Sequence, residues 1–422
     1  MPPLQSHVPR LTSHVSLPYL PPVNPNPDFL IIGGGIIGLN LALQAKARHL
    51  GARVVLIEKE DACGKHASGR NSGVLHAGFY YTADSLKARF TRDGCRRLTE
   101  YCLEKGLRIN RNGKLVVTRN ETELASLDEL ERRGKRNGVE LHAVSQKQAE
   151  EIEPRVRTFE RALFSPTTAA IDPSEVMRSF LNDAGAAGIE IHTDTAYLGV
   201  NGNGVKTTRG MYSAGYIINA AGLYADKVAR DFGFSADYRI LPFKGLYLYQ
   251  RQDAAPLRTN VYPVPDLQAP FLGVHLTVTV DGRVKLGPTA TPAFWREHYT
   301  GLDNFRPGEM SEVVFREALF FVRNDFSFRR LAFREIMKYS RRRMVRAAGE
   351  LAAGLELKHF PKWGQPGIRA QLVDIKRKKL VMDFCHEADE RSFHVLNAVS
   401  PAFTCAQPFT EHVFDEIERI AA

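Results

Sequence analysis

Three glycines near the N-terminus carry the clearest chemical signal in the chain. Gly33, Gly35 and Gly38 directly follow the apolar residues 29–32 and form the pattern G-x-G-x-x-G. In such a unit the first glycine permits a tight turn, the second lets the backbone approach a pyrophosphate, and the third lets a helix pack against the strand. We therefore predict a buried strand over 29–32 and a helix over 36–49 whose N-terminus faces the phosphates of a dinucleotide.

A carboxylate stands where this motif requires one. The apolar stretch 53–57 predicts a second strand and ends in Glu58, twenty residues after Gly38. At that position a carboxylate accepts hydrogen bonds from an adenosine ribose. A glycine-rich turn without a ligand is the alternative, but the complete strand–turn–helix–strand–carboxylate unit favours dinucleotide binding. The unit by itself does not distinguish a nicotinamide cofactor from a flavin.

A second corner of the same kind lies far along the chain. A strand is predicted over 216–219, and the small residues Ala220, Ala221 and Gly222 follow before a helix starts. Ligands bind at the carboxyl ends of parallel strands, so two such corners favour a large two-part cofactor, FAD, over a simple nicotinamide. The loop 68–81, in which small and polar residues alternate, suits close passage along that cofactor.

Composition and charge limit the class of protein. A chain of 422 residues predicts two domains, and 44% hydrophobic with 25% charged residues is typical of soluble globular proteins. No apolar run reaches the length of a membrane span. Five cysteines without a C-x-x-C pair indicate a reducing compartment and no metal site. The net charge of +10 favours an anionic partner, but without an RNA-binding motif we expect no nucleic acid.

The remaining stretches differ in character. The proline-rich residues 1–27 are expected to form a disordered tail. Alternating β-branched and aromatic residues over 236–300 are typical of an antiparallel sheet, and residues 312–346 are predicted to be helical. Ser400 as N-cap and Pro401 as first helical residue predict a C-terminal helix, whose N-terminus would stabilise negative charge on a bound ring. Further helices are expected over 84–106, over 121–136 and from Pro173, with Asp172 as N-cap, and a strand over 114–118.

Taken together, the motifs make the chain similar to the glycine oxidase/D-amino-acid oxidase superfamily of FAD enzymes. Within it, the chain resembles the group of L-2-hydroxyglutarate dehydrogenases and oxidases over nearly its whole length from Phe29. The most specific carriers of the resemblance are residues 71–81, N-S-G-V-L-H-A-G-F-Y-Y, and residues 262–266, Y-P-V-P-D. The chain departs from the pattern of that group at Lys244, Thr289, Val399 and Phe403.

The resemblance implies an α/β fold with an α+β substrate part. A discontinuous FAD-binding domain, Rossmann-like and doubly wound, would comprise residues 28–108, 162–232 and 362–422. A second domain with a mainly antiparallel sheet, residues 109–161 and 233–361, would cover the flavin and hold the substrate. The expected FAD-binding residues are Gly33, Gly35, Ile36, Ile37, Gly38, Glu58, Lys59, Ser68, Arg70, Asn71, Ser72, Gly73, Ala221, Gly222 and Ser400.

The implied reaction is FAD-dependent oxidation of (S)-2-hydroxyglutarate (L-2-hydroxyglutarate) to 2-oxoglutarate, by hydride transfer from C2 to flavin N5. Another small hydroxy acid, an amino acid or glycerol 3-phosphate is the alternative substrate. A dicarboxylate needs two cationic anchors, for which we select Arg369 and then Lys244, with Tyr262 as a hydroxyl donor. Ion pairing within the sheet is the alternative role of Arg369, and a solvated strand position that of Lys244. His76 and His275 are the candidates for the base that accepts the hydroxyl proton, and the sequence does not rank them.

The electron acceptor, a quinone or oxygen, is not identified by the sequence. Residues 316–346 contain ten basic and three acidic side chains interleaved with apolar ones. Phe333, Ile336 and Met337 with the neighbouring arginines suit a helix that lies on an anionic membrane. The alternative is a helix whose apolar face packs on the substrate domain. We expect a cytoplasmic protein, or a mitochondrial one in a eukaryote, in peripheral contact with the inner membrane.

Overall fold

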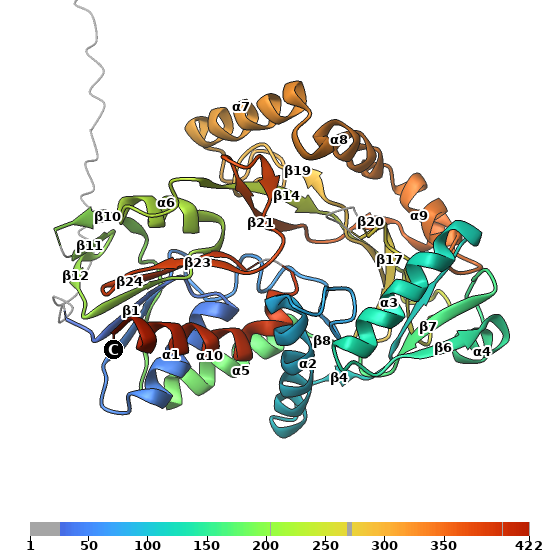
Figure 1. The fold of residues 1–422 in the computed structure, drawn as a ribbon, viewed down its shortest axis with the longest axis horizontal. Helices are drawn as coiled ribbons and strands as arrows, with labels where there is room; N and C mark the ends of the chain where they lie inside the picture. Colours follow the sequence, from blue (N-terminus) through green and yellow to red (C-terminus); the bar gives the residue numbers. More distant parts are fainter. Residues whose placement is uncertain (1–25, 203, 268–271, 399, 422) are drawn as a thin grey trace, which may run out of the picture.

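Two large sheets lie at opposite ends of the molecule, with a smaller sheet between them (Figure 1). This computed structural model describes residues 26–202, 204–267, 272–398 and 400–421. The predicted tail, residues 1–27, lies outside the described residues except for its last two. No helix in the described ranges combines the length and the apolar composition of a membrane span. All five cysteines are free thiols.

The first large sheet brings the two predicted corners together. Its six strands follow the order β23-β24-β13-β1-β2-β9, and all neighbours except β23 and β24 run parallel. Leu30 of β1 lies opposite Ile217 of β13, so the glycine turns that follow both strands meet at one edge. The strands are β1 (Phe29–Ile32), β2 (Val54–Ile57), β9 (Glu190–His192), β13 (Tyr216–Asn219), β23 (Cys385–Ala388) and β24 (Ser392–Asn397).

Both faces of this sheet are covered, as in a doubly wound fold. One face packs on α1 (Ile36–Arg48), α5 (Pro173–Ala186) and α10 (Ala402–Ala421), and α2 (Leu86–Glu104) packs against α10. The other face meets α6 (Ala225–Asp231) and a small sheet of β10 (Tyr197–Asn201), β11 (Gly204–Thr207) and β12 (Gly210–Ser213). The predicted N-cap of α5 is confirmed, because the Asp172 side chain accepts a hydrogen bond from Ser174 N at 2.8 Å.

The second large sheet has eight strands and is antiparallel except between β5 and β16. A core of aliphatic side chains packs α9 (Arg341–Gly349) on one face, and α3 (Leu124–Arg136) covers the other. The prediction of a mainly antiparallel substrate sheet is therefore confirmed. In spatial order the strands are β20 (Lys362–Trp363), β15 (Leu248–Tyr249), β18 (Val284–Gly287), β17 (His275–Val278), β16 (Asn260–Pro263), β5 (Lys114–Val117), β7 (Arg161–Ser165) and β6 (His142–Ser145).

A four-stranded sheet joins the two halves. Its centre is the antiparallel pair β14 (Tyr238–Gly245) and β21 (Gly367–Asp374), which places Phe243 opposite Arg369. Short strands β19 (Thr291–Pro292) and β22 (Lys379–Leu380) flank the pair. The helices α7 (Pro307–Arg323) and α8 (Phe328–Ile336) pack over this sheet, at the top of Figure 1.

The remaining elements are short. Strands β3, β8 and β4 form a three-stranded sheet, and η1 extends the N-terminus of α3. Their bounds and those of the other short elements are β3 (Val74–Leu75), β4 (Ile109–Asn110), β8 (Ala169–Ile171), α4 (Gln146–Ile152), η1 (Glu121–Glu123), η2 (Gly222–Tyr224), η3 (Asp325–Ser327), η4 (Met337–Tyr339) and η5 (Leu357–His359).

Some boundaries differ from those that we expected. Strands β7 and β20 belong to the eight-stranded sheet, although residues from 162 and from 362 were assigned to the FAD-binding part. We therefore propose the same two-part division with the substrate part extended to residues 165 and 363. The C-terminal helix begins at Ala402 and not at Pro401, so Ser400 does not directly precede its first residue.

Candidate active site

A single elongated cavity of about 1150 Å³ connects the carboxyl edge of the parallel sheet with β14 and β21. The cavity brings together most of the residues selected from the sequence. Sixteen of those twenty residues line it, from Glu58 at one end to Arg369 at the other, and the sixteen include Ser400, which precedes α10. The four that do not line it are Gly38, Gly73, Lys244 and Tyr262.

Each of the three motif positions requires glycine for a different structural reason. Gly33 has a φ of 114°, and a Cβ there would lie 2.5 Å from the Ala220 carbonyl oxygen, where the two corners touch. A Cβ on Gly38 would overlap the Gly33 carbonyl oxygen, so this residue serves helix–strand packing. A Cβ on Gly35 would meet only Ser68 Oγ, at 3.1 Å. Gly35 therefore leaves its backbone open toward the cavity, as pyrophosphate approach requires.

Glu58 is held in place by backbone donors. Its Oε2 accepts a hydrogen bond from Gly34 N at 2.7 Å, and its Oε1 accepts one from Glu60 N at 2.9 Å. The side chain is buried but lines the cavity. Because a carboxylate has about four acceptor sites, the two bonds fix the group and leave acceptor capacity for ribose hydroxyls.

The loop after Glu58 is braced by its own side chains. Asn71 Oδ1 accepts a hydrogen bond from Gly73 N at 2.8 Å, and Asn71 Nδ2 donates to Ser68 O at 2.7 Å. Gly73 has a φ of 75°, and a Cβ there would lie 2.5 Å from Ile171 O, so Gly73 shapes the loop without lining the cavity. Open backbone at the glycine turn, a fixed carboxylate and this polar loop together fit a bound FAD.

Lys59 belongs to an ion-pair network beside this loop. Its Nζ lies 2.6 Å from Glu297 Oε1 and also contacts Glu60, and His66 Nε2 lies 2.9 Å from Glu60 Oε1. Within the described residues, Glu60, His66 and Glu297 are the group of three side chains whose ligand atoms are close enough to hold a metal ion. The ammonium of Lys59 already pairs with both carboxylates, so we assign no metal to the group.

A cluster of basic groups occupies the other end of the cavity. His76, His275 and Arg369 all line the cavity, although they come from three distant parts of the chain. Burial lowers the pKa of His275 to about 3 and that of His76 well below its usual value. The positive charges of Lys114 and Arg369 lower the pKa of both imidazoles further. Both histidines are therefore neutral at physiological pH.

Two predicted substrate residues lie elsewhere. Phe243 and Gly245 line the cavity, whereas Lys244 between them does not, because successive side chains of a strand point to opposite faces. Lys244 is buried, and its charge acts on His298 on the far side of the strand. Tyr262 stacks on His275 with the ring centroids 3.9 Å apart and donates to or accepts from Thr277 Oγ1 at 3.3 Å. Tyr262 thus supports His275 from behind.

The sequence analysis missed a second cation in the cavity. Lys87, in the first turn of α2, is buried, lines the cavity and forms no ion pair among the described residues. Burial lowers its pKa to about 8, and the nearby charge of Arg369 contributes. The carboxylate that acts on Lys87, that of Asp383, accepts hydrogen bonds from the backbone N–H groups of Leu86 and Lys87 at 2.9 and 3.0 Å. A lysine at the start of an expected amphipathic helix was the available clue.

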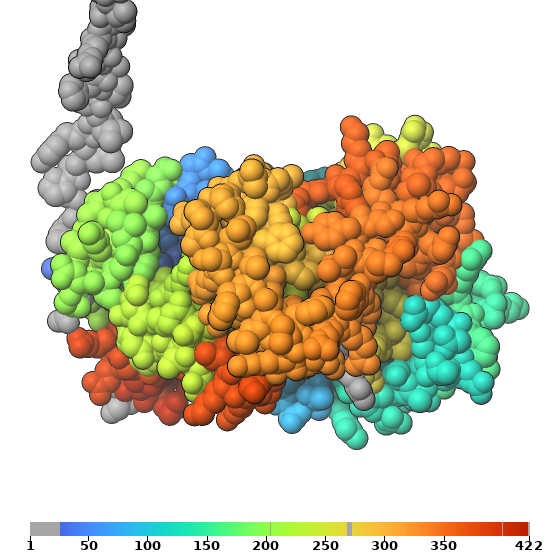
Figure 2. Space-filling model, turned by 90° about the horizontal axis from the view of Figure 1, so that it is seen from above, coloured from blue at the N-terminus to red at the C-terminus, as the bar shows by residue number. Residues whose placement is uncertain are grey.

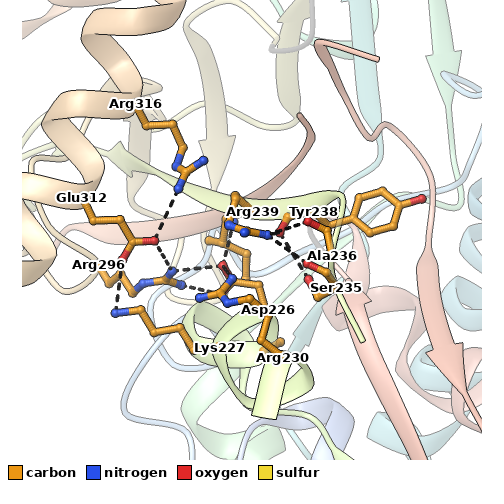
Figure 3. A network of polar contacts seen from close by, with 12 residues as sticks. Asp226, Lys227, Arg230, Ser235, Ala236, Tyr238, Arg239, Arg296, Glu312 and Arg316 are labelled. Atoms are coloured by element: carbon orange, nitrogen blue, oxygen red, sulfur yellow. Dashed lines mark hydrogen bonds and ion pairs between the residues drawn. The ribbon is translucent and has the colours of Figure 1, made fainter. Parts of the chain in front are cut away.

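A buried ion pair fixes the second corner to the covering helices. Asp226 of α6 binds Arg296 through two contacts of 2.7 and 3.0 Å, and neither side chain is more than 1% exposed. Burial acts to raise the pKa of Asp226, but the charge and hydrogen bonds of Arg296 outweigh it and lower the pKa. Glu312 of α7 lies 3.7 Å from Arg296, as Figure 3 shows. The network ties α7 to the corner that contains Gly222.

The fold and the site define a class of protein. Residues 28–381 match the family model described as FAD dependent oxidoreductase. The chain belongs to this family, and its cofactor is FAD.

Relatives with assigned activities cover nearly the whole chain. The mitochondrial L-2-hydroxyglutarate dehydrogenase of Homo sapiens is 33% identical over 427 residues, which cover 93% of this chain and 89% of the relative. The L-2-hydroxyglutarate dehydrogenase of Escherichia coli strain K12 is 34% identical over 403 residues, with 94% of each chain covered.

Solved structures confirm the fold. The FAD-bound L-α-glycerophosphate oxidase of Mycoplasma pneumoniae matches with a TM-score of 0.71 at 22% identity and covers 94% of each chain. Glycine oxidase from Geobacillus kaustophilus matches with a TM-score of 0.68 at 18% identity, covering 94% of this chain and 95% of that one. The predicted fold class, an FAD-binding domain with a mainly antiparallel second sheet, is therefore confirmed.

Proposed function

We propose that the protein oxidises (S)-2-hydroxyglutarate to 2-oxoglutarate. The observation that carries the proposal is the continuity of one cavity from the glycine turns to Arg369, Lys87 and two neutral histidines. Relatives at 33% and 34% identity that act as L-2-hydroxyglutarate dehydrogenases support the choice of substrate. Bound FAD supplies the acceptor for the hydride that leaves C2 of the substrate.

Two cations anchor the two carboxylates of the substrate. Arg369 offers a planar guanidinium that binds one carboxylate through two hydrogen bonds. Lys87 replaces Lys244 as our second anchor, because Lys87 lines the cavity and Lys244 does not. Two cationic side chains that line one cavity favour a dianionic ligand.

His275 is the better placed base of the two histidines. Its Nδ1 lies 2.9 Å from the carbonyl oxygen of Gly273. A carbonyl can only accept, so Nδ1 carries the proton and Nε2 keeps its lone pair for the hydroxyl proton of the substrate. A bound dianion raises the pKa of both imidazoles, because it offsets the charges of Lys114 and Arg369. His76 shares this electrostatic environment and is the second candidate.

A substrate panel tests the proposal. The FAD-loaded protein is assayed with a soluble dye as acceptor, so the natural acceptor does not limit the result. We expect the highest kcat/KM with (S)-2-hydroxyglutarate, and much lower values with its (R) enantiomer and with lactate. A preference for glycine or for glycerol 3-phosphate would assign the protein to another activity of the family.

We further propose that the protein contacts an anionic membrane and passes electrons to a quinone there, with oxygen as the alternative acceptor. We call the outer surface of α7, α8 and α9 the arginine face, and Figure 2 shows α7 and α8 spread across the molecule in orange. Arg323, Arg329, Arg330, Arg334, Arg342, Arg343 and Arg346 are exposed on it. The structure describes all of residues 307–349, and no acidic side chain in that range is exposed.

Apolar side chains stand out among these arginines. Phe315 is 73% exposed, Val322 70% and Phe333 62%, although the opposite sides of the same helices pack in a core over β14 and β21. The inner side of the helices therefore packs on the substrate part, and the composition of the outer side supports the proposed membrane contact. Exposed aromatic and aliphatic groups insert into the headgroup region, and each basic residue near an anionic surface contributes about 1 kcal/mol.

Liposome sedimentation tests the membrane contact. We expect the protein to sediment with anionic vesicles at low salt, less so at moderate salt, and not with neutral vesicles. The double variant Phe333→Ser/Ile336→Ser should reduce sedimentation, whereas Leu50→Ser, at an even more exposed site after α1, should not. A protein that stays in the supernatant with anionic vesicles at low salt would exclude the contact.

A further inference from the structure

A buried lysine lies behind the proposed base without a hydrogen-bonding partner. Lys114 is the first residue of β5 and is completely buried. Its Nζ forms no hydrogen bond to any described residue. Instead it lies 4.7 Å from the ring centroids of Phe79 and Tyr80, and 4.9 Å from that of Tyr262. Ring faces attract a cation, and this three-ring cage is the partner that the ammonium has.

Two rings of the cage connect the lysine with the active site. Tyr80 lines the cavity, and its buried hydroxyl also lacks a hydrogen-bonding partner among the described residues. Tyr262 stacks on His275, so its ring contacts both the ammonium of Lys114 and that imidazole. Buried polar groups without partners are rare in folded proteins and need a reason other than packing. Here two of them, the Lys114 ammonium and the Tyr80 hydroxyl, belong to one group of residues beside His275.

Cationic side chains from several elements of the fold act on the two histidines. Lys114 and Arg369 act on both His76 and His275, and Lys338 of η4 acts on His275 as well. Lys338 is paired with Glu335 at 2.6 Å, which offsets its charge. The ionisable group that acts on Lys114 itself is the thiol of Cys95 on α2. Burial lowers the pKa of Lys114 to about 7, so its ammonium is present in the acidic range in which the imidazoles titrate, and no carboxylate of the described residues is among the groups that act on it.

We propose that Lys114 is a positioning residue, whose ring-caged ammonium keeps His76 and His275 unprotonated and ready to accept the hydroxyl proton of an anionic substrate. In that transfer the substrate O–H bond breaks and an imidazole N–H bond forms. Burying a charged side chain in the cage costs more free energy than burying a neutral one. The lysine therefore lowers the free energy of unfolding, and its electrostatic role accounts for its presence. That the proton comes from the hydroxyl group of a hydroxy acid rests on the proposed function. The effect of Lys114 on the two histidines does not.

Direct titration of the imidazoles tests the proposal. FAD-loaded protein with 13C-labelled histidine is followed by NMR against pH without substrate, and His76→Asn and His275→Asn assign the two signals. In Lys114→Met we expect at least one of the two to titrate higher by about one pH unit. The melting temperature of Lys114→Met should be unchanged or higher. Lys244→Met, at another buried lysine, should leave both titrations as in the wild type.

Two further variants keep the result decisive. Lys114→Arg retains the charge and should titrate like the wild type, whereas Lys114→Gln should behave like Lys114→Met. Unchanged titration of both histidines in a folded neutral variant would overturn the proposal. Because no substrate is used, a failure to oxidise (S)-2-hydroxyglutarate would disprove the proposed function and leave this result intact.

Discussion

The two ends of the cavity satisfy their polar groups in different ways. At the nucleotide end, Glu58 accepts two backbone hydrogen bonds, and Asn71 closes the loop with bonds to Gly73 and Ser68. At the substrate end, Lys87 forms no ion pair among the described residues, and Lys114 has only aromatic rings around its ammonium. At the nucleotide end, hydrogen bonds within the protein hold these polar groups in place. At the substrate end, neither lysine has an ion-pair partner among the described residues.

This difference teaches what each end requires of its ligand. A cofactor that stays bound needs a rigid cradle, which backbone bonds and glycine turns provide at little cost. A substrate must bind, react and leave. Its binding energy comes from side chains that do not already form ion pairs or hydrogen bonds with other protein groups. Lys87 and the two neutral histidines, whose pKa values burial lowers, are available to interact with a substrate.

The largest effect should come from the packing glycine of the nucleotide end. Gly38→Val places a side chain on the Gly33 carbonyl oxygen, and we expect no folded flavoprotein. Gly35→Val meets only Ser68 Oγ, so this variant should fold but lose most of its FAD. Circular dichroism and flavin content of both variants separate the two roles. Normal flavin content in Gly35→Val would contradict the assignment of the pyrophosphate site.

The next largest effect concerns the guanidinium at the substrate end. Arg369→Lys keeps the charge but loses the planar fork, and we expect kcat/KM for (S)-2-hydroxyglutarate to fall about 100-fold or more. Flavin content and melting temperature serve as controls of cofactor binding and folding. A folded, FAD-loaded variant with unchanged kcat/KM would remove Arg369 from the substrate site.

A smaller, substrate-dependent effect is expected at the second cation. Lys87→Met should raise KM for (S)-2-hydroxyglutarate about tenfold or more and leave KM for a monocarboxylate such as (S)-2-hydroxybutyrate nearly unchanged. Lys244→Met is the matched control, because Lys244 is also buried but does not line the cavity. Equal effects of both lysine variants on both substrates would show that the cavity does not select a dicarboxylate through Lys87.

The smallest effect is on stability against pH. His275 has a pKa of about 3 in the folded protein, against about 6.5 when unfolded. Between these values the unfolded state binds a proton that the folded state does not, so the free energy of unfolding falls as the pH falls. The melting temperature of His275→Gln should therefore decrease less between pH 7 and pH 5 than that of the wild type. An equal decrease would mean that His275 is not the buried neutral group described, and exposed His142→Gln is the control.

Sequence alone determined the nucleotide end, because its determinants are local. Glycine spacing, strand length and the position of Glu58 are set within thirty residues of chain, and the structure places them as the pattern requires. The antiparallel second sheet was also readable, since period-two alternation reports a strand directly. The arrangement of the residues around Gly33 could thus be derived before any coordinates were known.

Which residues lie at the substrate end of the cavity became evident only from the tertiary structure. Lys244 does not line the cavity, because the face to which a strand residue points depends on register, and β14 pairs with β21 so that Phe243, not Lys244, lies opposite Arg369. Lys87 and Lys114 lie in stretches that carry the family resemblance, but their spacing indicates no role, and the proposed roles depend on how α2, β5 and β21 converge. A charge acquires its function there from burial and from its neighbours, and both are properties of chain segments far apart in sequence.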